Sequence, residues 1–200
     1  MRTTQRDLLV STAERLFAEQ GIDAVSLRTV MAEAGTNVAA VNYHFGTKDS
    51  LVEAVVRARS EEIREARDAL LTTLEGTAAP SVHGLAEAFV LPLADMAAAG
   101  DTAWIRMVAD VTAIGHPSLA VIDSEFAEQT ARLGALLRRV RPQLDAVSVR
   151  FRMTVAMTLA YRTLGDLPDL RTRVAGAGRS PVSDERLVAE LVDAVASILG

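Results

Sequence analysis

Apolar side chains recur three or four positions apart along most of the chain, which is the pattern of helices that bury one face. Alanine and leucine dominate the composition, and only 4% of the residues are aromatic, which favours helix over sheet. The spacing and the glycine and proline breaks predict helices over residues 4–19, 48–74, 82–98, 102–114, 118–140, 144–164 and 184–199. Two more short helices are expected within residues 26–45, so we predict an all-α fold of about nine helices.

Residues 26–45 predict two short helices around a tight corner. Ser26 can cap the first helix, because its hydroxyl can accept a hydrogen bond from an otherwise unpaired backbone N–H. Gly35 falls where that helix should end, and a glycine there can adopt the left-handed conformation that lets the chain reverse. Asn37 is a good cap for the next helix. The corner is therefore a candidate helix-turn-helix.

The second of these helices has two unlike faces. Val38, Val41 and Phe45 are spaced by three and four, so they face inward. The outward side chains are those of Ala39, Ala40, Asn42 and Tyr43. Small residues let a helix backbone approach the bases of the DNA major groove, and polar tips can reach base edges and phosphates. A helical hairpin inside an ordinary core would show the same inward face, so the pattern alone leaves both interpretations open.

Residues 34–51, which read AGTNVAAVNYHFGTKDSL, resemble the recognition-helix signature of the tetracycline-repressor (TetR) family. Members carry an alanine-glycine turn, a short helix that ends in an aromatic-His-Phe element, and a long helix that starts with a small residue, a lysine and an acid. The resemblance covers about residues 5–60, and beyond residue 65 it is one of architecture only. It implies a homodimeric, ligand-responsive transcription factor, with repression as the expected sign.

The resemblance also implies which side chains touch DNA. Those that would face the major groove are Asn37, Ala39, Ala40 and Asn42. Tyr43 and His44 would contact the sugar-phosphate backbone or the nearest bases. Lys48 would hold a phosphate, and Ser26 and Arg28 would hold the backbone of the opposite strand. This chain departs from many members in having Val38 where they carry a lysine or another polar group. Its outward face has few hydrogen-bonding groups, which leaves more of the specificity to Asn42, Tyr43, backbone groups and DNA shape.

A turn-rich cluster at residues 76–81 divides the chain. We expect a helix-turn-helix DNA-binding domain over residues 1–48, linked by the helix over residues 48–74 to a helical effector-binding and dimerisation domain over residues 75–200. The linking helix starts at the predicted phosphate contact and ends in the effector domain, so it can transmit movement between them. Residues 170–181 have the composition of a loop.

The middle of the chain carries methionines, aromatic residues and a single tryptophan, which can line an adaptable apolar cavity. The candidate pocket residues are Phe89, Leu93, Trp104, Met107, Val108, Phe126, Met153 and Met157. Two apolar stripes near the C-terminus predict a helix–helix interface between subunits, as the resemblance implies. The candidate interface residues are Met153, Ala156, Ala160, Leu187, Leu191, Val195 and Ile198. Ordinary burial within one protomer is the alternative for both sets.

Candidate chemistry is sparse. The chain has no cysteine, and none of its three histidines has a second histidine at metal-ligand spacing. The sequence shows neither a glycine-rich phosphate loop nor a nucleophile elbow, so we expect no catalytic residue, no metal and no cofactor. Apolar runs fall short of membrane-spanning length, and the amino terminus lacks the apolar stretch of a secretory signal. We therefore expect a cytoplasmic protein without a membrane partner.

Charge argues mildly against DNA binding, because the formal net charge is −5 and the first 50 residues hold five basic side chains against six acidic ones. DNA binding needs only a few cations on one surface, however. The predicted function is a ligand-responsive transcriptional regulator. Its expected partners are a double-stranded DNA operator, a second copy of the chain and a small apolar or amphipathic effector. The alternative is a helical small-molecule binding or scaffold protein that does not bind DNA.

Overall fold

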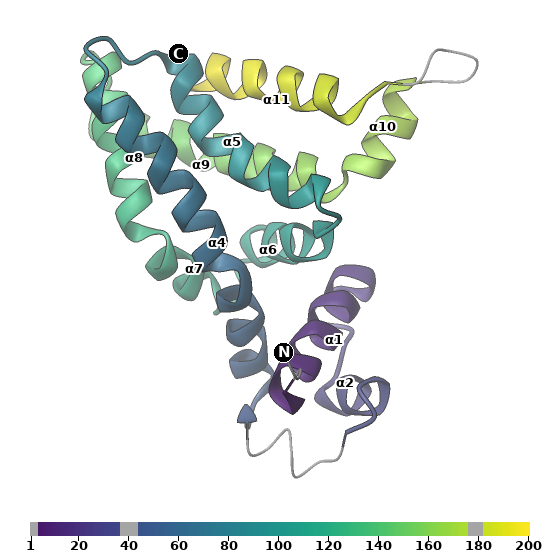
Figure 1. The fold of residues 1–200 in the computed structure, drawn as a ribbon. Helices are drawn as coiled ribbons and strands as arrows, with labels where there is room; N and C mark the ends of the chain where they lie inside the picture. Colours follow the sequence, from purple (N-terminus) through teal and green to yellow (C-terminus); the bar gives the residue numbers. More distant parts are fainter. Residues whose placement is uncertain (1–3, 37–43, 176–181) are drawn as a thin grey trace.

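The computed structural model describes residues 4–36, 44–175 and 182–200, and these ranges hold ten helices and no strand. The helices are α1 (Gln5–Gln20), α2 (Leu27–Glu33), α4 (Lys48–Gly76), α5 (Val82–Ala98), α6 (Thr102–Ile114), α7 (Leu119–Glu125), α8 (Ala127–Val140), α9 (Ala146–Gly165), α10 (Leu167–Ala175) and α11 (Asp184–Leu199). Long helix α4 joins a small head, made of α1 and α2, to a larger body made of α5 to α11 (Figure 1). The all-α prediction is confirmed.

Side-chain caps fix the helix starts in the head. Thr4 caps α1 in a reciprocal pair with Asp7, whose carboxylate accepts from the Thr4 backbone N–H at 3.0 Å. The Ser26 hydroxyl accepts from the Thr29 backbone N–H at 3.1 Å, so the predicted cap of α2 is confirmed. Gly35 has a φ of +62°, the left-handed conformation that the corner required.

Helix α4 runs for 29 residues, which makes it roughly 43 Å long. The Thr47 hydroxyl accepts from the Ser50 backbone N–H at 3.1 Å and defines its start. The first turns are buried against the head, and the later turns pack against α5, α7 and α8 of the body. A single rigid element therefore contacts both parts of the molecule.

Helix α6 belongs to the side of the body that meets the head, and it packs against α1 on one side and α9 on the other (Figure 1). The approach of α9 is close, because a Cβ added to Gly165 would lie 3.0 Å from the Arg106 Cα. The Arg106 guanidinium donates to the Gly165 carbonyl oxygen at 3.0 Å. Trp104 on the same helix is fully buried, and its indole N–H donates to the Val55 carbonyl oxygen of α4 at 3.0 Å.

Two predicted elements are corrected. The expected helix over residues 118–140 is two helices, because Phe126 has a φ of −111° and a ψ of 12° between α7 and α8. Its side chain stays buried at the spacing of a continuous helix, so the apolar pattern hides the break. The expected loop over residues 170–181 begins as α10, whose Leu167 is buried and anchors its first turn. Residues 176–181 lie outside the described ranges.

A buried carboxylate lies where α1 meets α4. Glu14 of α1 is almost inaccessible, and its Oε2 is 4.0 Å from Nε of Arg59, which also pairs with Asp101 at 3.0 Å. Burial raises the pKa of the Glu14 carboxyl above its usual value near 4.5, against the opposing effect of Arg59. The charged form of Glu14 is therefore costly in the folded protein.

We expect Glu14→Gln to change how stability depends on pH. A carboxyl whose pKa is higher in the folded than in the unfolded chain loses stability as pH rises from about 4.5 through the folded-state pKa. Urea unfolding at several pH values should show that the free energy of unfolding of the variant increases relative to that of the unmodified protein as the pH rises through this range. Glu19→Gln, which changes an exposed carboxylate on the same helix, is the control. An increase in the relative stability of the unmodified protein over the same pH range would contradict the burial argument.

Candidate DNA-contacting surface and interior cavity

The predicted DNA contacts within the described residues lie in the head and at the start of α4. Ser26 and Arg28 are exposed at the N-terminal turn of α2, and His44 is partly exposed. The Lys48 ammonium, in the first turn of α4, donates to the Asp23 carbonyl oxygen at 3.3 Å. This contact brings Lys48 to the loop that precedes α2. The predicted contacts Asn37, Ala39, Ala40, Asn42 and Tyr43 lie outside the described residues, so their roles stay predictions.

Two acidic side chains of the head pair with one arginine. Arg15 pairs with Glu19 at 3.2 Å and with Glu33 at 2.7 Å. At the N-terminal end of α1 the Arg6 guanidinium lies 5.7 Å from the ring centre of Phe45. Arg6 and Arg28 are both exposed, so the head can present cations to a phosphate backbone although its charges nearly cancel.

A cavity of about 220 Å³, partly open to solvent, lies between α4, α5, α7, α8 and α9, and we refer to it as the interior cavity. Its lining residues are Arg67, Phe89, Ile122, Asp123, Phe126, Thr130, Leu133, Arg150, Met153, Thr154, Met157 and Tyr161. Of the predicted pocket residues, Phe89, Phe126, Met153 and Met157 line it. The other four predicted residues do not line it and are fully buried in the core, namely Leu93, Trp104, Met107 and Val108.

Arg67 is the cavity residue that the sequence did not single out. It lies on α4 with only 5% of its surface exposed, although it belongs to a run of charged residues that predicts a solvated face. Its guanidinium carbon is 5.6 Å from the ring centre of Phe89 and 5.5 Å from that of Phe126. Ile63 and Leu71, four positions before and after it, are also buried, and this spacing was the available signal.

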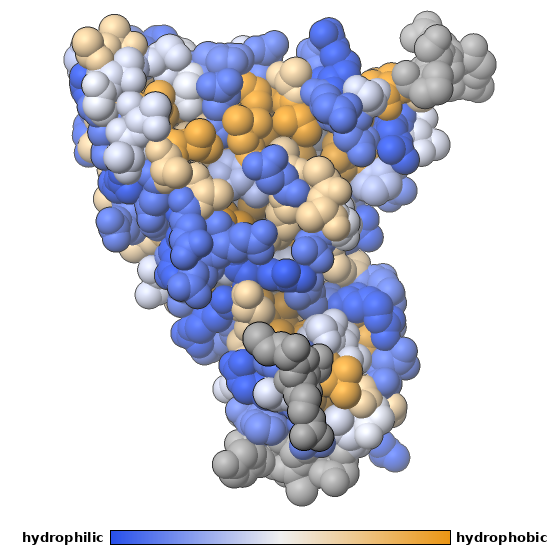
Figure 2. All heavy atoms as spheres, in the orientation of Figure 1, coloured by the Kyte–Doolittle hydropathy of each residue, from blue (hydrophilic) through white to orange (hydrophobic). Residues whose placement is uncertain are grey.

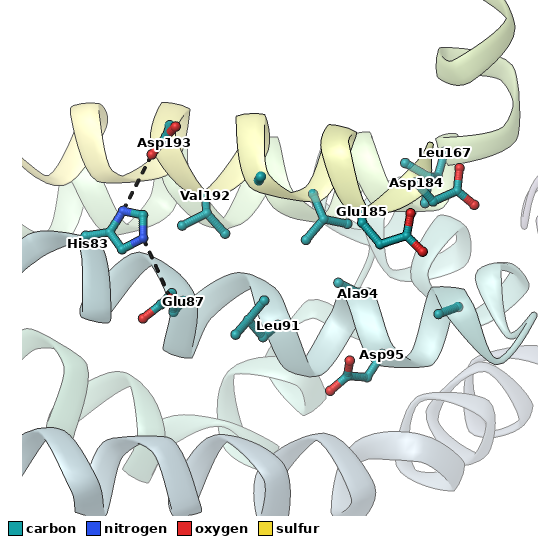
Figure 3. A pocket seen from close by; sticks show the side chains of 13 residues that line it. His83, Glu87, Leu91, Ala94, Asp95, Leu167, Asp184, Glu185, Val192 and Asp193 are labelled. Carbon is teal, nitrogen blue, oxygen red and sulfur yellow. Dashed lines mark ion pairs between the residues drawn. The ribbon is translucent and has the colours of Figure 1, made fainter. Parts of the chain in front are cut away.

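A second hollow, of about 420 Å³, lies on the surface between α5 and α11 (Figure 3). Apolar side chains, among them Leu91 and Val192, form its floor, and Figure 2 shows hydrophobic side chains gathered there between polar neighbours. Its acidic side chains are Glu87, Asp95, Asp184, Glu185 and Asp193. The His83 ring bridges two of them, 3.7 Å from Glu87 and 3.5 Å from Asp193. We refer to this hollow as the acidic groove.

The predicted interface residues lie mainly inside the protomer. Those that are buried within the single chain are Met153, Ala156, Ala160, Leu187, Leu191 and Val195, while Ile198 is partly exposed. They pack α9 against α5, α6 and α11, which is the alternative that the sequence left open. The apolar side chains that α9 exposes are Val147, Phe151 and Val155, with exposed fractions of 66%, 68% and 36%.

Among residues 4–36, 44–175 and 182–200, no group of three His, Asp or Glu side chains could hold a metal ion. No single helix in these ranges is long and apolar enough to cross a membrane. Helices α6 and α7 reach that length and composition only as a pair bent by 117°.

Two family models match this sequence. The model described as bacterial regulatory proteins of the tetR family matches residues 9–55. The model described as the tetracyclin repressor-like C-terminal domain matches residues 87–197, more than half of the chain. The chain therefore belongs to the tetR family of bacterial regulators.

Individual relatives agree with this assignment. The HTH-type transcriptional repressor Rv3405c of Mycobacterium tuberculosis is 28% identical over 192 residues, covering 96% of this chain and 87% of that protein. The structure of a tetR-family regulatory protein from Rhodococcus RHA1 matches with a TM-score of 0.68 at 16% identity, covering 100% of this chain and 98% of that one. A second tetR-family structure, from Rhodococcus sp., gives 0.66 at 15% identity, covering 98% and 99%. At such identities the two structures support the fold alone. The chain is a DNA-binding transcriptional regulator, not an enzyme.

Proposed function

We propose that this regulator is a homodimeric repressor of the cytoplasm, which binds a near-palindromic DNA operator and is released by a small effector in the interior cavity. The repressor named among its relatives supports the sign of regulation. The observation that carries the proposal is that α4 extends from the head to the cavity. Lys48 lies in its first turn at the head, and Arg67 of the same helix lines the cavity.

The proposed division of labour follows the predicted domains. Residues 1–48 would bind DNA, residues 75–200 would bind the effector and a second subunit, and α4 would connect them. The matches to the two family models, over residues 9–55 and 87–197, support this division because they fall on either side of the second half of α4. On DNA, Asn37, Ala39, Ala40 and Asn42 would face the major groove.

We propose that a second subunit covers the exposed apolar stripe of α9. Val147, Phe151 and Val155 follow one another at four-residue spacing, so they form one continuous face of the helix. An exposed apolar stripe of this kind marks an interaction surface. Pairing of two such helices across a twofold axis would give the symmetric dimer that a palindrome requires. The two recognition helices would then lie about 34–36 Å apart or at a multiple of that distance.

We expect Phe151→Glu to separate the dimer, because it places a charge in the centre of the stripe. Sedimentation of the purified variant should show a monomer that still unfolds cooperatively, because the side chain is 68% exposed in the single protomer. Val174→Glu, on exposed α10, is the matched control and should leave the dimer intact. A dimeric Phe151→Glu protein would place the interface elsewhere.

Helix α6 offers a path from the cavity to the head. The Tyr161 ring lines the cavity and lies 6.3 Å from the Trp104 ring, whose N–H binds α4. The opposite side of α6 packs on α1 of the head. An effector that fits one arrangement of these helices better than another would shift the spacing of the two heads, with a typical coupling of about 1–3 kcal/mol.

Protection of DNA by the purified protein tests the proposal. Footprinting on the DNA upstream of its own gene should show a protected near-palindrome. A dimer that protects no sequence would refute operator binding.

Effector contacts should involve the predicted residues that line the cavity, which are Phe89, Phe126, Met153 and Met157. The other predicted pocket residues lie in the core, namely Leu93, Trp104, Met107 and Val108.

A further inference from the structure

We infer that the interior cavity takes a small apolar ligand with a carboxylate, whose negative charge pairs with the buried guanidinium of Arg67. The inference rests on the proposed function only in treating this cavity as the effector site. It adds the chemical class of the ligand, which neither the fold nor the relatives specify.

The charge of Arg67 has no carboxylate partner within 4.0 Å in the described part of the chain. Arginine stays protonated in proteins, so the charge is permanent. Its Nε and one Nη donate to the carbonyl oxygens of Ala88 and Phe89, both at the long distance of 3.4 Å. The Tyr161 side chain lines the same cavity and acts on the pKa of Arg67 in the direction opposite to burial.

The neighbouring acid, Asp68, is already engaged by other groups. One of its carboxylate oxygens is 2.7 Å from an Nη of Arg132, and both oxygens accept from the Gln129 side-chain amide at 3.0 Å. Arg132 also pairs with Glu75 at 2.8 Å, which makes this a self-contained surface network. The positive charge at the cavity wall is therefore left largely uncompensated.

A buried charge without a counter-ion is costly in a folded protein. The Phe89 and Phe126 rings near the guanidinium supply part of the missing stabilisation through cation–π contacts. Burial lowers the pKa of Arg67, which agrees with a site that disfavours the bare cation. A ligand carboxylate would remove this penalty, and it could form the paired hydrogen bonds that suit a guanidinium.

Size and lining restrict the rest of the ligand. The cavity of about 220 Å³ is smaller than the roughly 300–1,000 Å³ typical of drug-sized ligands. Its polar residues include Arg67, Tyr161 and two threonines. Its other charged residues are Arg150 and Asp123, which are both exposed. The inner wall is apolar, with Ile122, Leu133, Met153 and Met157. These limits fit an acid with one ring or a short branched chain.

The acidic groove supplies an internal contrast. Five acidic side chains line it, so an anion is disfavoured there and a cation is favoured. The acidic groove and the interior cavity are therefore expected to differ in the ligand charge that they accept. A variant of the groove is consequently a matched control for a variant of the cavity.

The test measures binding of matched acids and amides to the full-length protein by calorimetry. The probes are benzoate with benzamide, and 3-methylbutanoate with its amide, at up to millimolar concentration. We expect at least one acid to bind about 10- to 100-fold more tightly than its amide, because hydrogen bonds to charged groups are the stronger ones. Arg67→Met should abolish this preference, whereas Glu87→Gln in the acidic groove should preserve it.

Arg67→Lys keeps the charge and serves as a second variant if Arg67→Met does not fold; it should retain most of the preference for the acid. Equal binding of acid and amide, or no binding of either acid, would overturn the inference. Measuring DNA release in parallel separates it from the proposed function. An acid that binds through Arg67 without releasing DNA supports the ligand class and refutes the effector role. If a neutral ligand binds as tightly as its acid and releases DNA, the effector role is supported and the ligand class is refuted.

Discussion

Trp104→Ala should destabilise the protein by about 3–5 kcal/mol, the usual cost of truncating a buried tryptophan. Trp104 is inaccessible to solvent, and it ties α6 to α4 through hydrogen bonds to the Val55 and Val56 carbonyl oxygens at 3.0 and 3.1 Å. The variant would leave a cavity where the head meets the body. For a chain of 200 residues this corresponds to a fall in melting temperature of roughly 6–20 °C.

Trp104→Phe separates packing from hydrogen bonding. It keeps an aromatic ring in the core and removes only the N–H and part of the volume, so its cost should be clearly smaller. Urea unfolding of both variants measures the two effects. A loss below about 1 kcal/mol for Trp104→Ala would show that α6 does not hold the head on the body, and the path from cavity to head would lose its basis.

Lys48→Ala should weaken DNA binding by of order 100-fold at low salt. Each subunit would lose one charge-assisted phosphate contact, and a dimer loses two. The slope of log affinity against log salt should become shallower by about 2, because two fewer phosphates are neutralised. Binding measured by fluorescence anisotropy over a salt series gives both numbers.

The control for Lys48→Ala is Arg138→Ala, which removes an exposed cation from the last turn of α8 in the body. It should change neither the affinity nor the salt slope. The melting temperature of Lys48→Ala must also be measured, since its ammonium binds the Asp23 carbonyl oxygen at 3.3 Å within the protein. Equal losses for the two variants would mean that DNA contacts the body rather than the head.

Helices and their starts were largely predictable from the sequence, because they depend on local chemistry. Ser26 caps the helix that it was expected to cap, and Thr47 caps the helix that was predicted to start at residue 48. Helices α6 and α11 have the predicted bounds. The break at Phe126 was not predictable, since apolar spacing continues through it. Loop composition at residues 170–181 likewise gave no sign of Leu167, whose burial against the body anchors α10.

The interior site was predicted only in part, because it depends on how distant helices meet. Apolar residues of the middle region divide into core and cavity walls only when α4, α5 and α9 are packed together, so Phe126 lines the cavity and Trp104 does not. Arg67 was missed because a charge within a charged run predicts solvent exposure. The same argument applies to α9, where sequence alone could not tell that Ala156 faces its own protomer and Phe151 faces outward.

Selection of bound sequences from random double-stranded DNA by the full-length protein tests the central claim most directly. The account predicts enrichment of two inverted half-sites whose centres lie about 10–10.5 base pairs apart or at a multiple of that spacing, each bound by one subunit of a dimer. Recovery of no motif, or of a single half-site bound by a lone subunit, would contradict it.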